Sequence, residues 1–123
     1  MASEGYHEPA ELLETATMDR HRAIISLMEE LEAVDWYDQR IDATSDPELA
    51  ALLAHNRDEE KEHAAMVLEW LRRRDPRLDE ELRTYLFTDG DILGVEDTAT
   101  GSSAPGAQAD GSLGIGSLRG KGI

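Results

Sequence analysis

Three side chains of this sequence have the types and the spacing of metal ligands. Glu60 and His63 form a Glu-x-x-His pair within one helical pattern, and Glu30 is a carboxylate at the middle of the preceding one. A carboxylate-bridged di-iron site takes a Glu from each of two helices and a Glu-x-x-His from each of two others. The chain therefore holds half of such a ligand set, and we predict that a symmetric dimer completes it.

The three residues are compatible with several metals and also with a purely structural role. Two carboxylates and an imidazole suit iron or manganese, and zinc or calcium can use the same atoms without redox chemistry. In the alternative interpretation, Glu30, Glu60 and His63 form a self-satisfied polar cluster that fixes the register of a coiled coil. Glu-x-x-His alone is a weak signal because acidic helices often contain it by chance.

Composition and charge exclude several classes of protein. The 123 residues include 27 acidic and 12 basic side chains, which gives a formal net charge of −15. This charge disfavours a nucleic-acid or an anionic-membrane partner and suits a protein that attracts cations. Cysteine is absent, which excludes thiolate zinc sites, iron–sulfur clusters and cysteine nucleophiles. No apolar run approaches the roughly 20 residues that span a bilayer, and no signal peptide is recognisable, so we expect a cytoplasmic protein.

Two long helices are predicted to position the ligands. The first spans residues 9 to about 41, with Pro9 at its first position, and the second spans about 47 to 74. Apolar residues recur in both at the intervals of an amphipathic helix. The connection between them, with Asp46 or Ser45 as N-cap, is so short that it implies antiparallel neighbours. We therefore predict an all-α fold built on a helical hairpin.

The hairpin is expected to bring the three ligands to one height. They interrupt the apolar seams of the two helices, Glu30 in the first and Glu60 and His63 in the second. Glu30 lies 14 residues before Thr44, near the middle of the connection, and Glu60 lies 16 residues after it. At 1.5 Å per residue, the two carboxylates come within roughly 3 Å of the same height. His63 follows one turn later on the same face.

A short third helix and a polar tail follow the hairpin. Apolar side chains at helical spacing predict a helix over residues 78–87. From Thr88 the composition changes to small and polar residues, which is typical of a disordered linker. We divide the chain into a hairpin domain over residues 1–96, a flexible linker over 97–110 and a C-terminal segment over 111–123.

Three of these segments resemble a known family. Residues 28–37 and 55–64 look like the two metal-bearing helices of the encapsulated ferritins, and residues 83–87 look like their third helix. The resemblance covers about residues 7–96. It implies a two-helix subunit that dimerises into a ferritin-like four-helix bundle, and an open ring of dimers such as a homodecamer.

The same resemblance implies a function and a site. It implies a di-iron ferroxidase centre on the twofold axis, with Glu30, Glu60 and His63 of each subunit as iron ligands, two irons per dimer and Tyr37 nearby. We therefore expect an enzyme that oxidises Fe(II) to Fe(III) with O₂ for iron storage. The main alternative is a non-catalytic acidic protein that binds metal or scaffolds assembly. A di-iron enzyme acting on a small organic substrate or on peroxide is disfavoured, because two helices leave little room for an apolar pocket.

Further acidic residues are candidates for transient cation binding. The resemblance implies that Glu29 and Glu32, with Trp36 beside them, form an uptake site on the way to the centre. From the residues alone, a solvated acidic face is the better explanation of Glu29 and Glu32. A histidine and two carboxylates share an outer face of the second helix, and we interpret this face as a solvated surface that binds cations weakly at most: His55, Glu59 and Glu62. Calcium is a second candidate cation at such acidic surface sites.

The end of the chain resembles the targeting peptide by which cargo proteins dock inside encapsulin shells. Residues 113–119 place Leu113, Ile115 and Leu118 between small residues, which suits docking of an extended segment into grooves. A phosphate-binding loop is disfavoured because no strand is expected before these glycines and no helix after them. The other alternative is a disordered segment that binds other proteins non-specifically. We expect an encapsulin shell protein as partner and a location inside the encapsulin nanocompartment. Residues 120–123 have no role in this interpretation.

Overall fold

A computed structural model describes residues 5–101, 117–118 and 121–122 of the chain. It confirms the predicted all-α class, since the regular structure of residues 5–101 is entirely helical. The chain divides into two compact units between Leu71 and Arg72. None of the described helices combines the length and the apolarity that crossing a bilayer requires.

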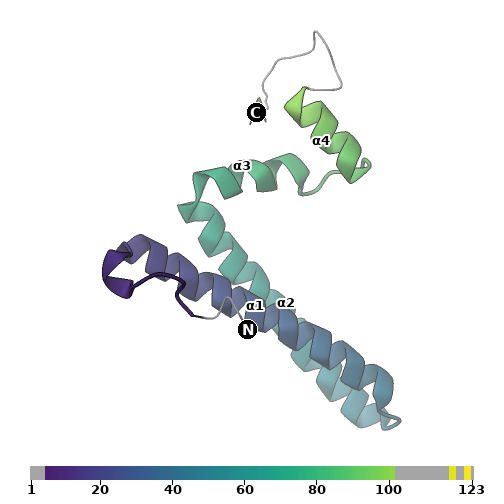
Figure 1. Ribbon diagram of the computed structural model, residues 1–123. Coiled ribbons are helices and arrows are strands. Elements are labelled where there is room, and N and C mark those ends of the chain that lie inside the picture. The colour runs from purple at the N-terminus through teal and green to yellow at the C-terminus, as the bar shows by residue number, and fades with distance from the viewer. Residues whose placement is uncertain (1–4, 102–116, 119–120, 123) are drawn as a thin grey trace. The chain divides into compact units, whose positions relative to one another are not determined.

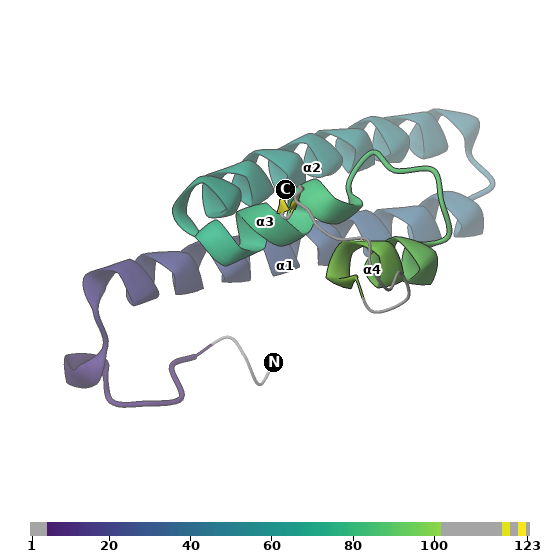
Figure 2. The same cartoon turned by 90° about the horizontal axis from the view of Figure 1, so that it is seen from above.

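The first unit is a helical hairpin of α1 (Thr15–Ala43) and the greater part of α2 (Pro47–Arg74). The two helices lie side by side and antiparallel in both ribbon views (Figure 1 and Figure 2). Asp46 caps α2, because its Oδ1 accepts a hydrogen bond of 3.1 Å from the Glu48 amide. Pro47 follows at the first helical position, so the predicted bounds of the second helix are confirmed.

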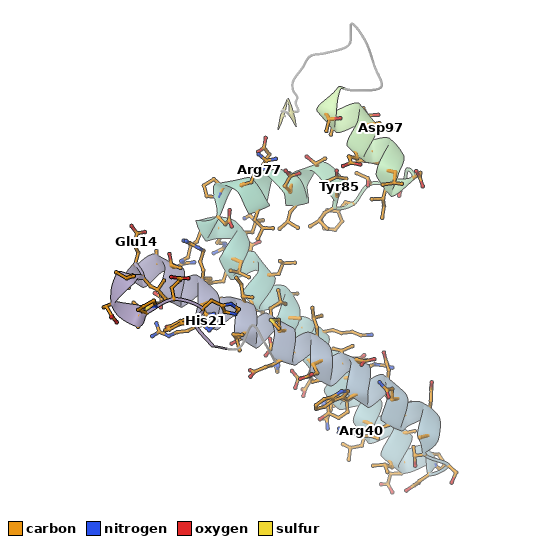
Figure 3. The ribbon with its side chains drawn as sticks, in the orientation of Figure 1. Glu14, His21, Arg40, Arg77, Tyr85 and Asp97 are labelled. Atoms are coloured by element: carbon orange, nitrogen blue, oxygen red, sulfur yellow. The ribbon has the colours of Figure 1, made fainter. Side chains whose placement is uncertain are left out.

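The predicted start of the first helix is wrong. Ala10–Leu12 form a separate 3₁₀ helix, and α1 begins only at Thr15 because the two residues between them are extended. This break lets the preceding segment turn back along α1. The Tyr6 ring packs on the His21 ring with centroids 4.9 Å apart (His21 is labelled in Figure 3). In a helix continuous from Pro9, the first residue would lie roughly 18 Å along the axis from His21.

The second unit contains α3 (Pro76–Tyr85) and α4 (Ile92–Thr100). The predicted third helix is therefore present and begins two residues earlier than expected. Asp75 determines this start, since its Oδ1 accepts a hydrogen bond of 3.0 Å from the Leu78 amide. Burial, and to a lesser extent the charge of Glu96 on α4, raises the pKa of Tyr85 at the end of α3.

Asp79 is the centre of an ion-pair cluster in the second unit. Arg72 donates a short hydrogen bond to its Oδ1, and Nε of Arg83 lies 2.9 Å from the same atom. Partial burial on its own would raise the pKa of Asp79, but the hydrogen bonds from Arg72 and Arg83 outweigh it and hold this pKa below its usual value. The cluster thus ties the last turn of α2 to α3.

The linker predicted from Thr88 is wrong where α4 forms. The chain reverses at Phe87, whose φ of 63° is left-handed and whose side chain is fully exposed. Asp91 then caps α4 by accepting a hydrogen bond of 3.1 Å from the Gly94 amide. Gly101 ends the helix with a left-handed φ of 73°. These caps stabilise a helix in a segment whose average composition is typical of a linker.

Two short strands are described near the C-terminus. β1 (Ser117–Leu118) and β2 (Lys121–Gly122) pair in antiparallel register, with Ser117 opposite Gly122. The remainder of the predicted linker and targeting segment lies outside the described residues, so the domain boundaries stay a prediction.

The hairpin has few buried apolar side chains. Within the described residues, the buried core consists of Ala64 and Leu71, which are 7% and 5% exposed. Large apolar side chains on α1 and α2 remain exposed instead: Ile24, Leu31, Trp36, Leu49, Leu52 and Met66. Two amphipathic helices bury only part of their apolar surface against each other, and a small core gains from association with a further partner.

Candidate metal centre

Glu30, Glu60 and His63 converge at the middle of the hairpin. Each offers one ligand atom, and these atoms all lie within 4.8 Å of one another. Nδ1 of His63 is 3.3 Å from Oε1 of Glu60 and 4.0 Å from Oε2 of Glu30. One candidate ligand comes from α1 and two come from α2, and these short distances show that they lie at the common height expected from counting residues.

The three side chains differ in their exposure to solvent. Glu30 is 24% exposed, Glu60 28% and His63 49%. Oε1 of Glu30 is buried, and no hydrogen bond reaches it from the described residues. A buried polar atom without a partner costs about 1–3 kcal/mol, and a bound cation would supply the missing partner. Carboxylate oxygen and imidazole nitrogen suit iron, manganese or zinc, so the donor set fits a divalent metal.

The site is incomplete as a di-metal centre within one chain. Two carboxylates and one imidazole are fewer donors than two metal ions require. In the part of the chain that the structure describes, no second group of three acidic or histidine residues lies within ligand distance. The missing donors must come from water, from substrate or from another subunit.

Tyr37 and Trp36 lie on α1 between the candidate ligand Glu30 and the turn. Tyr37 is seven residues from Glu30, two helical turns along the same face and roughly 10 Å along the axis. The guanidinium carbon of Arg40 is 5.7 Å from the Tyr37 ring centroid and 6.0 Å from that of Trp36. Arg40, labelled near the turn in Figure 3, thus makes cation–π contacts with both rings. Tyr37 lies on the ligand face but outside the ligand group.

The other acidic residues singled out in the sequence also stay outside the ligand group. On α1, Glu29 is exposed and Glu32 is half-buried. On α2, Nε2 of His55 lies 3.3 Å from Oε2 of Glu59 on an exposed surface, and Glu62 is exposed as well. The uptake role of Glu29 and Glu32 and weak cation binding by the outer face of α2 stay predictions.

Arg57 joins the two helices close to the candidate centre, a contact that the sequence analysis missed. Its Nη1 lies 3.0 Å from Oδ1 of Asp38 on α1, and its Nε lies 3.1 Å from Oδ1 of Asp58. These hydrogen bonds, the one to Asp38 first, raise the pKa of Arg57. The sequence shows that Arg57 lies three positions before Glu60, on the same part of the second helix. Only the packed hairpin identifies Asp38 as its partner on α1.

Comparisons with known proteins agree on one family. The profile of the EncFtn-like family matches residues 5–89. An encapsulated ferritin-like protein of Rhodospirillum rubrum is 65% identical over 128 residues, which cover 98% of this chain and 91% of the relative. A ferritin-like protein of Thermotoga maritima is 53% identical over 110 residues, which cover 89% of this chain and 94% of the relative.

A shorter match and a solved structure extend this similarity. An encapsulin nanocompartment cargo protein of Myxococcus xanthus is 42% identical over 52 residues, which cover 42% of this chain and 40% of the relative. The crystal structure of a protein from Nitrosomonas europaea superposes with a TM-score of 0.70 at 66% sequence identity, covering 72% of this chain and 97% of that one. With its helical hairpin, its convergent carboxylates and these matches, the chain belongs to the EncFtn-like family of encapsulated ferritin-like proteins.

Proposed function

We propose that the protein is a ferroxidase whose di-iron centre is shared between two subunits. The observation that carries the proposal is the buried and unpartnered Oε1 of Glu30, next to Glu60 and His63. Two copies of this half-site contain four carboxylates and two imidazoles, which is the ligand set of carboxylate-bridged di-iron sites. Membership of the EncFtn-like family supports the same conclusion.

Fe(II) is the substrate of the proposed reaction and O₂ is the electron acceptor. The carboxylates of Glu30 and Glu60 would hold the two cations, bridge them and offset their charge, which favours the ferric product. Nδ1 of His63 faces these carboxylates, so each imidazole would bind one iron from the side and leave space for O₂. Tyr37, on the same face of α1, is the nearest candidate for a further role in the reaction.

Exposed apolar side chains beside the ligands support a subunit interface at this site. Leu31 directly follows Glu30 and is 54% exposed, and Met66 follows His63 by one turn and is 63% exposed. Covering such a side chain contributes about 1.5–3 kcal/mol. We propose that a second hairpin covers this face to form a four-helix homodimer. The family resemblance extends this to a ring of dimers such as a decamer.

Glu29 and Glu32, with Trp36, form the proposed uptake site for Fe(II). Their carboxylates flank the ligand face of α1, where two copies facing each other across a dimer axis could hold a cation transiently. Calcium is a second cation for such exposed carboxylates. Glu32→Ala should change the time course of iron oxidation without removing iron from the centre. An unchanged time course would argue against an uptake role.

An encapsulin shell is the proposed partner of the C-terminal segment. Relatives from Rhodospirillum rubrum and Myxococcus xanthus are named as an encapsulated protein and as an encapsulin cargo protein. We propose that residues 113–119 dock inside such a shell and that Fe(III) leaves the centre for storage there. Deletion of residues 111–123 should abolish co-purification with a shell protein and leave iron oxidation intact.

Native mass spectrometry with and without Fe(II), combined with oxygen uptake, tests the ferroxidase proposal. We expect even numbers of subunits, two irons per dimer and rapid oxygen consumption. Glu60→Ala should keep the helices and lose both iron binding and fast oxidation. Glu62→Ala is the matched control, because it removes the same charge from an exposed position two residues away. Metal bound in loose and variable numbers without oxygen uptake would instead support the non-catalytic acidic scaffold.

A further inference from the structure

A thioether side chain borders the candidate centre. Met66 follows His63 by three residues on α2, so the two side chains are neighbours on one face, about 5–6 Å apart at Cβ. Long helical side chains lean towards the preceding turn, which here carries His63. Met66 is 63% exposed in the single chain and belongs to the apolar side chains around the ligands.

The two other described methionines differ from Met66 in their spacing from the candidate ligands. The chain has four Met and no Cys, so thioethers are its only sulfur groups. Met28 is half-buried on α1, two residues before Glu30, and residues at this spacing do not face each other on a helix. Met18 is also half-buried and lies 12 residues before Glu30, roughly 18 Å along the axis. Met66 is therefore the sulfur group placed beside the ligands.

We propose that Met66 is a modification site that accepts oxygen from hydrogen peroxide made at the centre, an inference that rests on the proposed ferroxidase function. Two Fe(II) ions give two electrons to one O₂, which takes up two protons and becomes H₂O₂. The thioether sulfur then attacks one peroxide oxygen with its electron pair. The O–O bond breaks and the sulfur–oxygen bond forms. The second oxygen leaves as hydroxide and takes the proton of the transferred oxygen, so that the products are the sulfoxide and water.

The modification has a protective consequence for the centre. Each sulfoxide formed at Met66 removes one peroxide next to His63 and the carboxylates. Methionine sulfoxide is reduced back by sulfoxide reductases, so the acceptor is renewable. The sulfoxide is also polar, and at the border of an apolar face it weakens packing. Met66 therefore limits chemical damage at the ligands at the expense of a temporary loss in subunit contact.

Peptide mass spectrometry after iron turnover tests this assignment. Trypsin separates Met66 in residues 62–72 from Met28 in residues 23–40. The full chain is allowed to oxidise Fe(II) in air with catalase present, which removes peroxide from bulk solution. We expect several-fold more added oxygen at Met66 than at Met28, and no such difference when iron-free protein receives hydrogen peroxide together with catalase.

Two variants complete the test. Met66→Leu should keep the first-turnover rate of iron oxidation and lose the added oxygen from residues 62–72. Glu60→Ala should lose fast iron oxidation together with the preference for Met66. Suppose that the wild type oxidises iron but oxygen is added equally to both peptides, or to His63 instead of Met66. This result would overturn the Met66 proposal and leave the ferroxidase proposal standing. A wild type that oxidises iron no faster than Glu60→Ala would instead refute the ferroxidase function.

Discussion

Replacement of Glu30 by Gln should stabilise the metal-free protein and remove its stabilisation by metal. Without a cation, Glu30 and Glu60 place carboxylate oxygens within 4.8 Å of each other, and one oxygen of Glu30 is buried without a partner. Gln has almost the same shape and no charge. Its amide N–H can donate a hydrogen bond to the Glu60 carboxylate, so both costs fall in the metal-free state.

Coulomb's law sets the size of this effect. Two unit charges at 4.8 Å repel by about 3.5 kcal/mol at an effective dielectric constant of 20 and by about 0.9 kcal/mol in water. Glu30 and Glu60 are 24% and 28% exposed, so water screens the pair in part. We expect Glu30→Gln to gain about 1–2 kcal/mol, and each kcal/mol raises the Tm of a small domain by about 4–8 °C.

Metal should reverse this order of stability. A metal present at 100 times its Kd adds about 2.7 kcal/mol to the wild type, whereas Glu30→Gln lacks one of the anionic ligands and should gain much less. Thermal unfolding by circular dichroism, at one protein concentration, compares both proteins in EDTA and in Mn(II), which does not oxidise in air at neutral pH. Glu62→Gln is the control for loss of an exposed charge.

Two results of thermal unfolding would contradict these roles of Glu30. If the metal-free Glu30→Gln protein melts below the wild type, repulsion and desolvation do not dominate at this position. If Mn(II) raises the Tm of both proteins equally, Glu30 is not a ligand.

Three further predictions concern the hairpin and, separately, the helices of the second unit. Arg57→Ala should lower the Tm of the metal-free protein, because the Arg57–Asp38 pair joins α1 to α2, and Arg57→Lys should recover part of this loss. If both variants melt at the wild-type temperature, solvent screens the pair completely. The pKa of Asp79 is lower in the folded state than in the unfolded state, so the ionised carboxylate stabilises the fold. This stabilisation is fully present above the ordinary carboxyl pKa of 3.8 and is lost as the pH falls through the lower folded-state pKa. Acid unfolding curves of wild type and Asp79→Asn should therefore converge at low pH, and a constant difference between them would contradict this. Gly101→Ala should speed hydrogen exchange in α4, since the left-handed φ of 73° costs about 1 kcal/mol with a side chain; unchanged exchange would mean that the cap does not limit the helix.

Local signals in the sequence were sufficient to predict the connection of the hairpin and the bounds of α2. Asp46 and Pro47 define the start of α2, and Asp75 with Pro76 defines its end and the start of α3. These residues act through their own backbone and their nearest amides, so no distant contact is needed to predict their effect. The common height of Glu30 and the Glu-x-x-His motif follows from helix rise and the short connection.

Two helices differ from their prediction, each for a different reason. The composition after Thr88 indicated a linker, but capping by Asp91 and Gly101 stabilises α4 there. At the N-terminus, Pro9 can start a helix, yet the chain turns back so that Tyr6 reaches His21. The first error neglected caps, which a sequence contains; the second depended on a contact between residues that are distant along the chain.

The sequence alone therefore predicted the bounds of α2, the short connection before it and three candidate metal ligands, Glu30, Glu60 and His63. The apolar seam singled out Glu30 among the acidic residues of the first helix, but it did not give the burial of its individual oxygen atoms, because burial is a property of packed helices. Only the packing of α1 against α2 places the three ligand atoms within 4.8 Å and leaves Oε1 of Glu30 buried without a partner. The same packing pairs Arg57 with Asp38, since contacts between helices depend on rotation and register that periodicity does not specify.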